Sequence, residues 1–489
     1  MQYRLSKSKF LAAFQCRKRL WLEIHDKDKA TPINKVQEAI FNQGHFVGDL
    51  AMNQYPNGVE ITSDYLDIPK GIAITKEVIK KNPPSIFEGF FQYNNVLVRP
   101  DIMVNNNDGS WDFIEVKSST KLKEENIRDV AIQTYVLIGS GIKIRNSYLM
   151  HINRECQFPD LDNLFELEDL TDEIIPFISD MDNSLINLRL MLDEKKEPDI
   201  PIGTHCTNPY NCSFKEYCWK DVPEYSVFNI PGMYLSKKEE LYKKDLIDIQ
   251  DVGKNFDLKN RQKDFFDSYI SKKPIINKKA IAKELDALEY PLYFIDFETF
   301  SPAVPQFKGL HPYEQYPFQY SCHIMDKNNN LTHKEYLHTD TQDPRLPLTE
   351  SLIKTLEQKG TIIAFNAAFE KGVINKLANQ FPQYENQLLS INKRFWDQLI
   401  IFKKYYMDYR FKGSNSLKAV LPIIVSGMDY SHLDVSDGNK AQVAWADMIA
   451  LSNSKQKETL ITQLLEYCKL DTLAMVEIHK QLIKLGELK

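Results

Sequence analysis

This sequence has few cysteines, no long apolar run and no large excess of positive or negative charge. Seven cysteines in 489 residues are too few for a disulfide framework. No run approaches the ~18 to 20 apolar residues of a membrane-spanning helix, and the first residues lack the apolar core of a signal peptide. The net charge of -6 excludes a global basic field that would drive non-specific nucleic-acid binding. We therefore expect a cytoplasmic protein without a membrane partner, in which any nucleic-acid site is a local groove.

The length of the chain predicts more than one domain. Residues 1–222 carry one set of chemical motifs and residues 291–489 carry another. Between them, residues 223–290 mix lysines with acidic residues, and their sparse leucines and isoleucines have helical spacing. The pattern predicts an α/β protein of two domains joined by a helical connector.

Two apolar runs separated by the stretch 105–109, which is rich in asparagine and ends in glycine, predict a β-hairpin. The turn folds Asp101 back towards Glu115, and Lys117 shares a face with Glu115 because side chains alternate along a strand. Two carboxylates bind Mg²⁺ or Mn²⁺, and a lysine beside them can assist the attacking water or stabilise charge on a phosphate. The hairpin predicts a metal-dependent nuclease site, with an exposed hairpin of scattered charges as the alternative.

Four cysteines bracket this hairpin in the sequence. Cys16 lies upstream, within a helix predicted from Ser6 to about Glu23, and Cys206, Cys212 and Cys218 lie downstream. Thiolates hold iron–sulfur clusters or zinc, and such spacing in an intracellular chain is more typical of metal binding than of disulfides. The other three cysteines have apolar neighbours and are expected to be ordinary buried thiols.

The hairpin and the cysteines together resemble the RecB-like PD-(D/E)xK nucleases that carry an iron–sulfur cluster, such as the CRISPR-associated RecB-like nucleases and bacterial helicase–nuclease subunits. The resemblance implies a restriction-endonuclease-like domain and a [4Fe-4S] cluster on the four cysteines. Zinc is the alternative, because five residues rather than the usual two separate Cys206 from Cys212. The resemblance also implies that His45 is a metal ligand and that Gln133, on a helix after the hairpin, belongs to the site.

A second acidic pattern occupies the C-terminal part of the chain. Asp296 and Glu298 alternate onto one face at the end of a predicted buried strand. Glu370 follows another predicted strand, and Tyr467 and Asp471 are one turn apart on a strongly periodic helix. Carboxylates in such positions can converge on two metal ions about 3.5 to 4 Å apart, which supports phosphodiester hydrolysis.

In this order, the three acidic stretches resemble the DEDD exonucleases of the DnaQ-like superfamily, in their tyrosine subtype, which have an RNase H-like fold. The resemblance implies that Asp296, Glu298 and Asp471 hold the metal ions and that digestion runs from the 3′ end. It further implies that Glu370, in place of the usual aspartate, supports the metals and that Tyr467 orients the attacking water. The whole arrangement resembles an uncharacterised bacterial family that joins a RecB-like nuclease to a DnaQ-like exonuclease.

These features predict a metal-dependent nuclease that acts in DNA repair, phage defence or CRISPR-associated processing. The expected partner is nucleic acid, with DNA favoured over RNA, and the sequence does not identify protein partners. An RNA-processing exonuclease is one alternative, because the metal sites do not read the sugar. A nucleic-acid-binding scaffold in which one nuclease centre is inactive is the other alternative.

Overall fold

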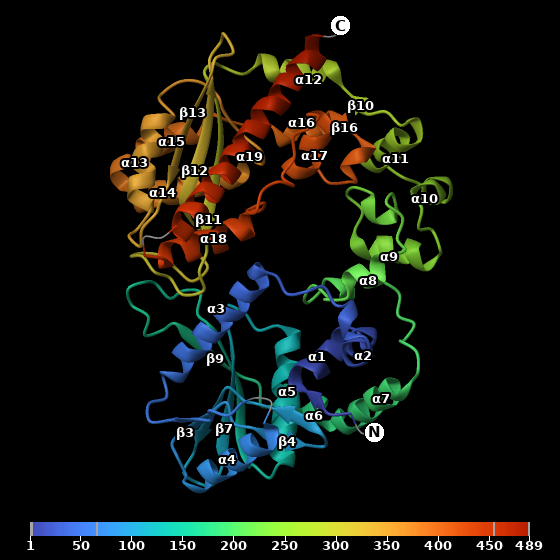
Figure 1. Cartoon of the computed structure of the whole chain (residues 1–489), viewed down its shortest axis with the longest axis vertical. Helices are drawn as coiled ribbons and strands as arrows, with labels where there is room; N and C mark the ends of the chain where they lie inside the picture. The colour runs from blue at the N-terminus through green and yellow to red at the C-terminus, as the bar shows by residue number, and fades with distance from the viewer. Residues whose placement is uncertain (1–2, 65–66, 453–454, 488–489) are drawn as a thin grey trace. The chain divides into compact units, whose positions relative to one another are not determined.

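The computed structural model describes residues 3–64, 67–452 and 455–487 and divides the chain into two compact units (Figure 1). Unit 1 comprises Met1–Asp221 together with Pro302–Tyr313, and unit 2 comprises Val222–Ser301 together with Glu314–Lys489. Each unit combines helices with a β-sheet, which confirms the predicted α/β class. Over the described ranges, no helix has both the length and the apolar character needed to cross a membrane.

Unit 1 is built on a six-stranded sheet with the order β2-β3-β6-β7-β8-β9. Its strands are β2 (Val59–Glu60), β3 (Ser85–Phe87), β6 (Ile102–Asn105), β7 (Trp111–Lys117), β8 (Ile144–Ile152) and β9 (Phe165–Asp169). A smaller sheet contains β1 (Leu5–Ser6), β5 (Val96–Val98) and β4 (Phe91–Tyr93). The helices are α1 (Lys7–Gln15), α2 (Arg17–His25), α3 (Lys35–Met52), α4 (Ile68–Lys80), α5 (Glu124–Gly139), α6 (Ile175–Ser179), α7 (Met181–Asp193) and α8 (Lys215–Trp219).

The predicted hairpin is formed by β6 and β7, in which Ile102 lies opposite Ile114. Side chains alternate along β7, so Phe113 joins the core built with α1, α2 and α5, whereas Ile114 joins a second core with α3. Glu115 and Lys117 share the face of Phe113. The strand therefore directs both of them towards α1 and α5, where Glu115 meets Lys7 and Lys117 meets Asp129.

The helix predicted from Ser6 to about Glu23 is two helices in the structure. Cys16 has extended backbone, with φ -163° and ψ 119°, and separates α1 from α2. Its N–H still donates to the carbonyl of Ala12 at 2.9 Å, so Cys16 closes α1 before the chain turns. The break was missed because apolar residues recur on both sides of Cys16 with a spacing that fits one helix.

Unit 2 contains a five-stranded sheet with the order β13-β12-β11-β14-β15, in which β11 is antiparallel to β12 and parallel to β14. Its strands are β11 (Leu292–Phe300), β12 (Tyr316–Met325), β13 (Leu331–Leu337), β14 (Ile362–Ala364) and β15 (Phe395–Asp397). The helices are α9 (Leu235–Lys243), α10 (Ile249–Asn255), α11 (Arg261–Ser271), α12 (Lys278–Asp286), α13 (Arg345–Thr355), α14 (Ala368–Gln380), α15 (Glu385–Asn392), α16 (Leu399–Lys404), α17 (Leu417–Ile424), α18 (Gly438–Ala450) and α19 (Lys455–Glu487).

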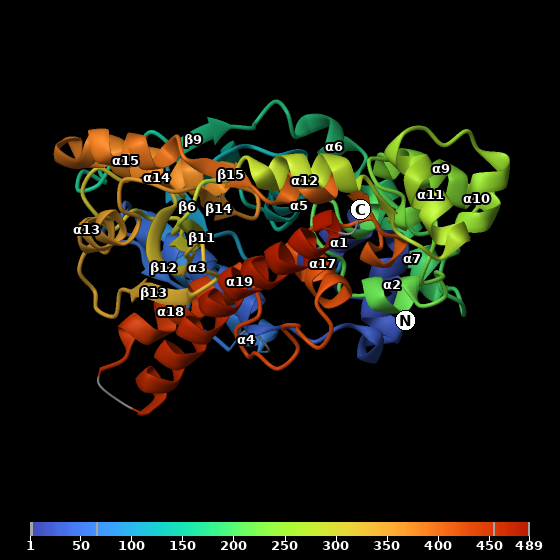
Figure 2. The same cartoon turned by 90° about the horizontal axis from the view of Figure 1, so that it is seen from above.

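Alternation along β11 decides which face of this sheet carries the acidic residues. The odd-numbered residues from 293 to 297 enter a core with α13, α14 and α15, whereas Leu292 and Phe294 pack with residues of α19. Asp296 and Glu298 continue the even-numbered series and therefore emerge on the face that α19 covers. Figure 2 shows α14 and α15 on one side of this sheet and α19 on the other.

The predicted connector, residues 223–290, is part of unit 2 rather than a separate element. Its apolar residues form a core that includes Met407, and its strand β10 (Ile275–Ile276) pairs with β16 (Tyr406–Met407). Short helices with few apolar residues need such a partner surface, because helices of this length are marginal alone.

The segment Pro302–Tyr313, predicted as part of the C-terminal domain, belongs to unit 1. Ala303 lies in a buried cluster with Val47 and Ile152, and Gly309 donates its N–H to the carbonyl of Phe158 at 3.0 Å. The chain therefore enters unit 1 directly after β11 and returns to unit 2 at residue 314.

Candidate active sites

Three carboxylates from separate motifs meet in unit 2. Asp296 and Glu298 at the end of β11, and Asp471 on α19, each place one carboxylate oxygen within 4.8 Å of the other two. Among the described residues, this is the one group of three or more histidine, cysteine or acidic side chains that meets so closely. The structure thus brings together the three residues that were predicted as metal ligands.

When ionised, these carboxylates repel one another. No described lysine or arginine forms an ion pair with any of them to offset that repulsion. Burial raises the pKa of Asp296 and Glu298 well above the usual range, and the negative charge of Asp471 adds to the shift. Burial also raises the pKa of Asp471, to about 6. A divalent cation would relieve the repulsion, and carboxylate oxygens are the donors that Mg²⁺ and Mn²⁺ prefer, so the group fits such an ion.

Two tyrosines and a lysine surround Asp471. The hydroxyl of Tyr430 donates to Asp471 Oδ1 at 2.5 Å, and Tyr467 is buried one turn before Asp471 on α19. Both hydroxyls lower the pKa of Asp471, against the larger effect of burial. The ammonium of Lys418 lies 5.3 Å from the centre of each tyrosine ring. Tyr467 was predicted, whereas Tyr430 and Lys418 were missed because no acidic pattern marks their part of the chain.

Glu370 lies near this group in the first turn of α14. Its carboxyl is buried, and Oε2 has no hydrogen-bond partner. Burial raises its pKa to about 8, with a further contribution from the charge of Asp397. The charge of Glu370 in turn raises the pKa of Asp296 and Glu298. A buried carboxylate oxygen without a partner fits a position that supports a nearby cation.

Unit 1 contains a second acidic cluster, at the end of the predicted hairpin. Asp101 Oδ2 accepts a backbone N–H of β7 at 2.7 Å, which holds Asp101 beside Glu115. From α5, Gln133 donates to Glu115 Oε2 at 2.6 Å and to Asp129 Oδ1 at 2.9 Å. Lys117 Nζ lies 2.6 Å from both Glu115 Oε1 and Asp129 Oδ2. The predicted residues Asp101, Glu115, Lys117 and Gln133 are thus together, and Asp129 joins them.

A second lysine enters this cluster from the first position of α1. Lys7 Nζ is 2.7 Å from Glu115 Oε1 and 3.6 Å from Asp129 Oδ1. Burial opposes the ionisation of Glu115, but the charges of Lys117 and Lys7 outweigh it and lower the pKa of this carboxyl. Burial and the charge of Glu115 raise the pKa of Asp101 to about 8. Sequence reasoning missed Lys7 because it lies 108 residues before Glu115 in a segment without acidic residues.

The structure does not place His45 with the other predicted ligands. His45 is exposed on α3, and α3 packs on the face of β7 opposite to the face of Glu115. No hydrogen bond or ion pair within the described ranges joins His45 to Asp101 or Glu115. The cluster therefore consists of the carboxylates, the two lysines and Gln133.

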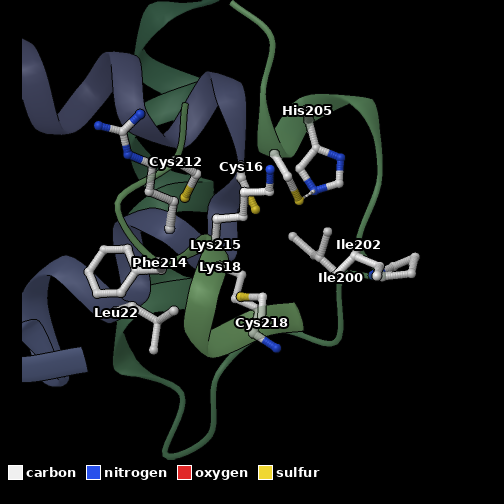
Figure 3. A pocket seen from close by; sticks show the side chains of 13 residues that line it. Cys16, Lys18, Leu22, Ile200, Ile202, His205, Cys212, Phe214, Lys215 and Cys218 are labelled. Carbon is white, nitrogen blue, oxygen red and sulfur yellow. Dashed lines mark hydrogen bonds between the residues drawn. The ribbon is translucent and has the colours of Figure 1, made fainter. Parts of the chain in front are cut away.

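The four predicted cysteine ligands line one small cavity in unit 1 (Figure 3). Cys16 comes from the junction of α1 and α2, Cys206 from a 3₁₀ turn, Cys212 from the following loop and Cys218 from α8. Burial raises the pKa of the thiols of Cys16, Cys212 and Cys218, to about 11 for Cys218. Metal ions bind thiolates, so a bound metal would have to supply the positive charge that stabilises them.

Gln15 fixes the downstream loop against α1. Its side-chain amide donates to the carbonyl of His205 at 2.8 Å and to that of Tyr210 at 2.6 Å. The N–H of Cys212 donates to the carbonyl of Cys206 at 3.0 Å, which closes the loop between these two cysteines. The five-residue spacing is therefore compatible with a cavity shared by all four thiols.

The remaining cysteines are buried, as predicted. Cys156 lies in unit 1, and Cys322 and Cys468 lie in unit 2. Cys468 is on α19 with Sγ 3.8 Å from Asp296 Oδ2, so it lies against the acidic group of unit 2.

Comparison with known proteins gives relatives without an assigned function. A family model described as "Domain of unknown function (DUF2779)" matches residues 293–416, which include Asp296, Glu298 and Glu370. The chain is 24% identical to "Uncharacterized protein MG366" of Mycoplasma genitalium, over 44% of this chain and 35% of that protein. It is 27% identical to "Uncharacterized protein MG366 homolog" of Mycoplasma pneumoniae, over 39% of this chain and 32% of that protein.

The matched region spans about a third of the length of these curated relatives. Among solved structures, the "Crystal structure of SSO0001" matches with a TM-score of 0.24 and 12% identity. That match covers 45% of this chain and 87% of the other.

Proposed function

We propose that the chain is a metal-dependent nuclease with two catalytic centres, a RecB-like PD-(D/E)xK centre in unit 1 and a DnaQ-like 3′-to-5′ exonuclease centre in unit 2. The observation that carries the proposal is the convergence of Asp296, Glu298 and Asp471 within 4.8 Å. Their order along the chain and their positions on a strand end and a late helix match the exonuclease pattern. Unpaired carboxylates at this separation are a costly arrangement without a cation.

In unit 2, Asp296, Glu298 and Asp471 would hold Mg²⁺ or Mn²⁺, and Glu370 would support them. The bound ions would activate water and stabilise charge on the phosphoryl group. Tyr467 would orient the attacking water through its hydroxyl.

In unit 1, Asp101 and Glu115 would hold the ion and Lys117 would stabilise the developing charge on the phosphate. Gln133 fixes one oxygen of Glu115 and one of Asp129 through its amide. The side chains are therefore held in position before substrate binds, which is what transition-state stabilisation requires.

For the cysteine site we propose an iron–sulfur cluster such as [4Fe-4S], with zinc as the second candidate. The support is that four thiols from segments far apart in the sequence line one cavity. Thiolates hold both kinds of centre, so the iron and zinc content of the purified protein decides between them.

DNA is the proposed substrate and the cytoplasm the proposed compartment, with RNA as the second candidate substrate. The test is incubation of the full-length protein with end-labelled single- and double-stranded DNA and RNA, with and without Mg²⁺ or Mn²⁺. We expect degradation that requires the metal. The Asp447→Asn variant, which alters an exposed carboxyl on α18, serves as a control for loss of one acidic charge in unit 2 and should degrade the same strands. Intact strands under every condition would contradict the proposal.

A further inference from the structure

The two acidic centres differ in how their negative charge is compensated. In unit 1, Lys7 and Lys117 make four ion-pair contacts of 2.6 to 3.6 Å with Glu115 and Asp129. Both ammonium groups share Glu115 Oε1, while Gln133 donates to Oε2, so each oxygen of Glu115 already has a partner. In unit 2, by contrast, no described cation forms an ion pair with the three converging carboxylates.

A divalent cation that binds Glu115 therefore has to displace a cation that is already there. Lys117 is held by two contacts of 2.6 Å to two different carboxylates, and it extends from the rigid strand β7. Lys7 has one contact of 2.7 Å and a longer one of 3.6 Å, while the two lysine side chains are about equally exposed, at 25% for Lys7 and 27% for Lys117. Lys7 is the more weakly held of the two and can withdraw towards solvent.

The position of Lys7 in α1 is a second reason to expect that Lys7 is the lysine that is displaced. Lys7 is the first residue of the helix, where a positive side chain is unfavourable next to the positive end of the helix dipole. The carboxylates of Glu115 and Asp129 are what stabilise an ammonium group at this position. Once a metal ion compensates these charges, little holds Lys7 in the cluster.

We propose that Lys7 is a built-in counter-ion of the unit 1 centre, which compensates Glu115 and Asp129 when no metal is bound and is displaced when a divalent cation binds. Lys7 is thus a positioning residue that sets the metal affinity of unit 1. The inference rests on the proposed nuclease function of unit 1 and adds a residue that controls its metal binding.

The test is a Mn²⁺ titration of the full-length protein, followed through the electron paramagnetic resonance signal of free Mn²⁺. All proteins carry Asp296→Asn and Glu298→Gln, so that unit 2 does not contribute. Lys7→Met should bind Mn²⁺ about tenfold more tightly than this parent, because the competing ammonium is gone. Lys7→Arg, which keeps the charge, should stay within about twofold of the parent on the same energy scale.

Lys9→Met is the matched control, since Lys9 lies on α1 two residues further on and faces another direction. It should leave Mn²⁺ affinity unchanged. If circular dichroism shows that Lys7→Met is not folded, Lys7→Gln replaces it in the comparison. Unchanged or weaker Mn²⁺ binding by a folded Lys7→Met or Lys7→Gln variant, with the parent still binding, would overturn this inference alone. Absence of Mn²⁺ binding in both parent and variant would overturn the proposed function of unit 1 as well.

Discussion

Asp471 links the acidic group of unit 2 to the tyrosines beside it, and its protonation controls whether that group can accept a cation. Because burial raises its pKa from 3.8 to about 6, the folded protein holds a proton that the unfolded chain releases. The stability from protonated Asp471 is fully present below about pH 4 and is lost as the pH rises through 6. Metal binding has the opposite dependence, because it needs the carboxylate.

We therefore expect the Mn²⁺ affinity of unit 2 to fall by at least about tenfold per pH unit below pH 6, because the raised pKa values of Asp296 and Glu298 add to the effect of Asp471. The measurement is a Mn²⁺ titration at several pH values with a Glu115→Gln protein, in which unit 1 lacks a ligand. The same titration is repeated with Asp296→Asn and Glu298→Gln added to the Glu115→Gln protein. It measures the Mn²⁺ bound outside the two centres. An affinity that stays constant from pH 7 to pH 5 would contradict the role of Asp471.

Tyr430 lowers the pKa of Asp471 through its 2.5 Å hydrogen bond. Tyr430→Phe should raise this pKa, and the pH at which metal-dependent trimming is half-maximal should rise by about one unit, as expected for a hydrogen bond to a charged group. Tyr320→Phe is the control, since this hydroxyl contacts Ser351 and Thr355 in the core of unit 2. An unshifted pH profile in Tyr430→Phe would show that Tyr430 does not act on Asp471.

The sequence predicts a site residue when the pattern that marks it lies within a few neighbouring residues. Asp296 and Glu298 alternate on one strand and Tyr467 precedes Asp471 by one helical turn, so short-range periodicity places each pair. Lys7 and Tyr430 act through partners more than 40 residues away, and no pattern around them marks that contact. The position of His45 away from Asp101 and Glu115 could not be predicted for a related reason, because the face of β7 on which α3 packs is set by tertiary structure.

At the scale of elements, the junction between α1 and α2 is what directs Cys16 into the cysteine cavity. Cys16→Ser should remove the brown colour and the absorbance near roughly 400 nm of anaerobically purified protein, because a hydroxyl is a poor iron ligand. Unfolding of unit 1 should begin at lower temperature, since the cluster would join segments far apart in the sequence.

Cys322→Ala is the control for this change, because Cys322 is fully buried in unit 2. This variant should keep the colour and the iron content. Purified protein that holds stoichiometric zinc and no iron would contradict the cluster while leaving the four ligands in place.

At the scale of the whole molecule, the two units have separate hydrophobic cores, and each should unfold as its own cooperative unit. Phe113→Ala in unit 1 and Trp445→Ala in unit 2 remove fully buried rings, and each change should cost about 3 to 5 kcal/mol. Differential scanning calorimetry should show two transitions, with Phe113→Ala lowering one and Trp445→Ala lowering the other. A single transition lowered equally by both changes would contradict this division.

Sequence composition placed the end of the first unit at residue 222, next to the structural division after Asp221. It could not show that Pro302–Tyr313 belongs to unit 1, because that assignment depends on long-range contacts such as the hydrogen bond from Phe158 to Leu310. Composition also could not show that the predicted helical connector shares its core with Met407, for the same reason.

Digestion of a 3′-labelled single strand in Mn²⁺ tests the division of labour between the two centres most directly. Full-length protein carrying Asp296→Asn and Glu298→Gln should lose release of the labelled mononucleotide, because metal-assisted displacement has no substitute for these ligands. Lys117→Ala should keep this release, since Lys117 belongs to the centre in unit 1. If the double variant still trims the 3′ end while Lys117→Ala does not, the exonuclease lies in unit 1 and the account is wrong.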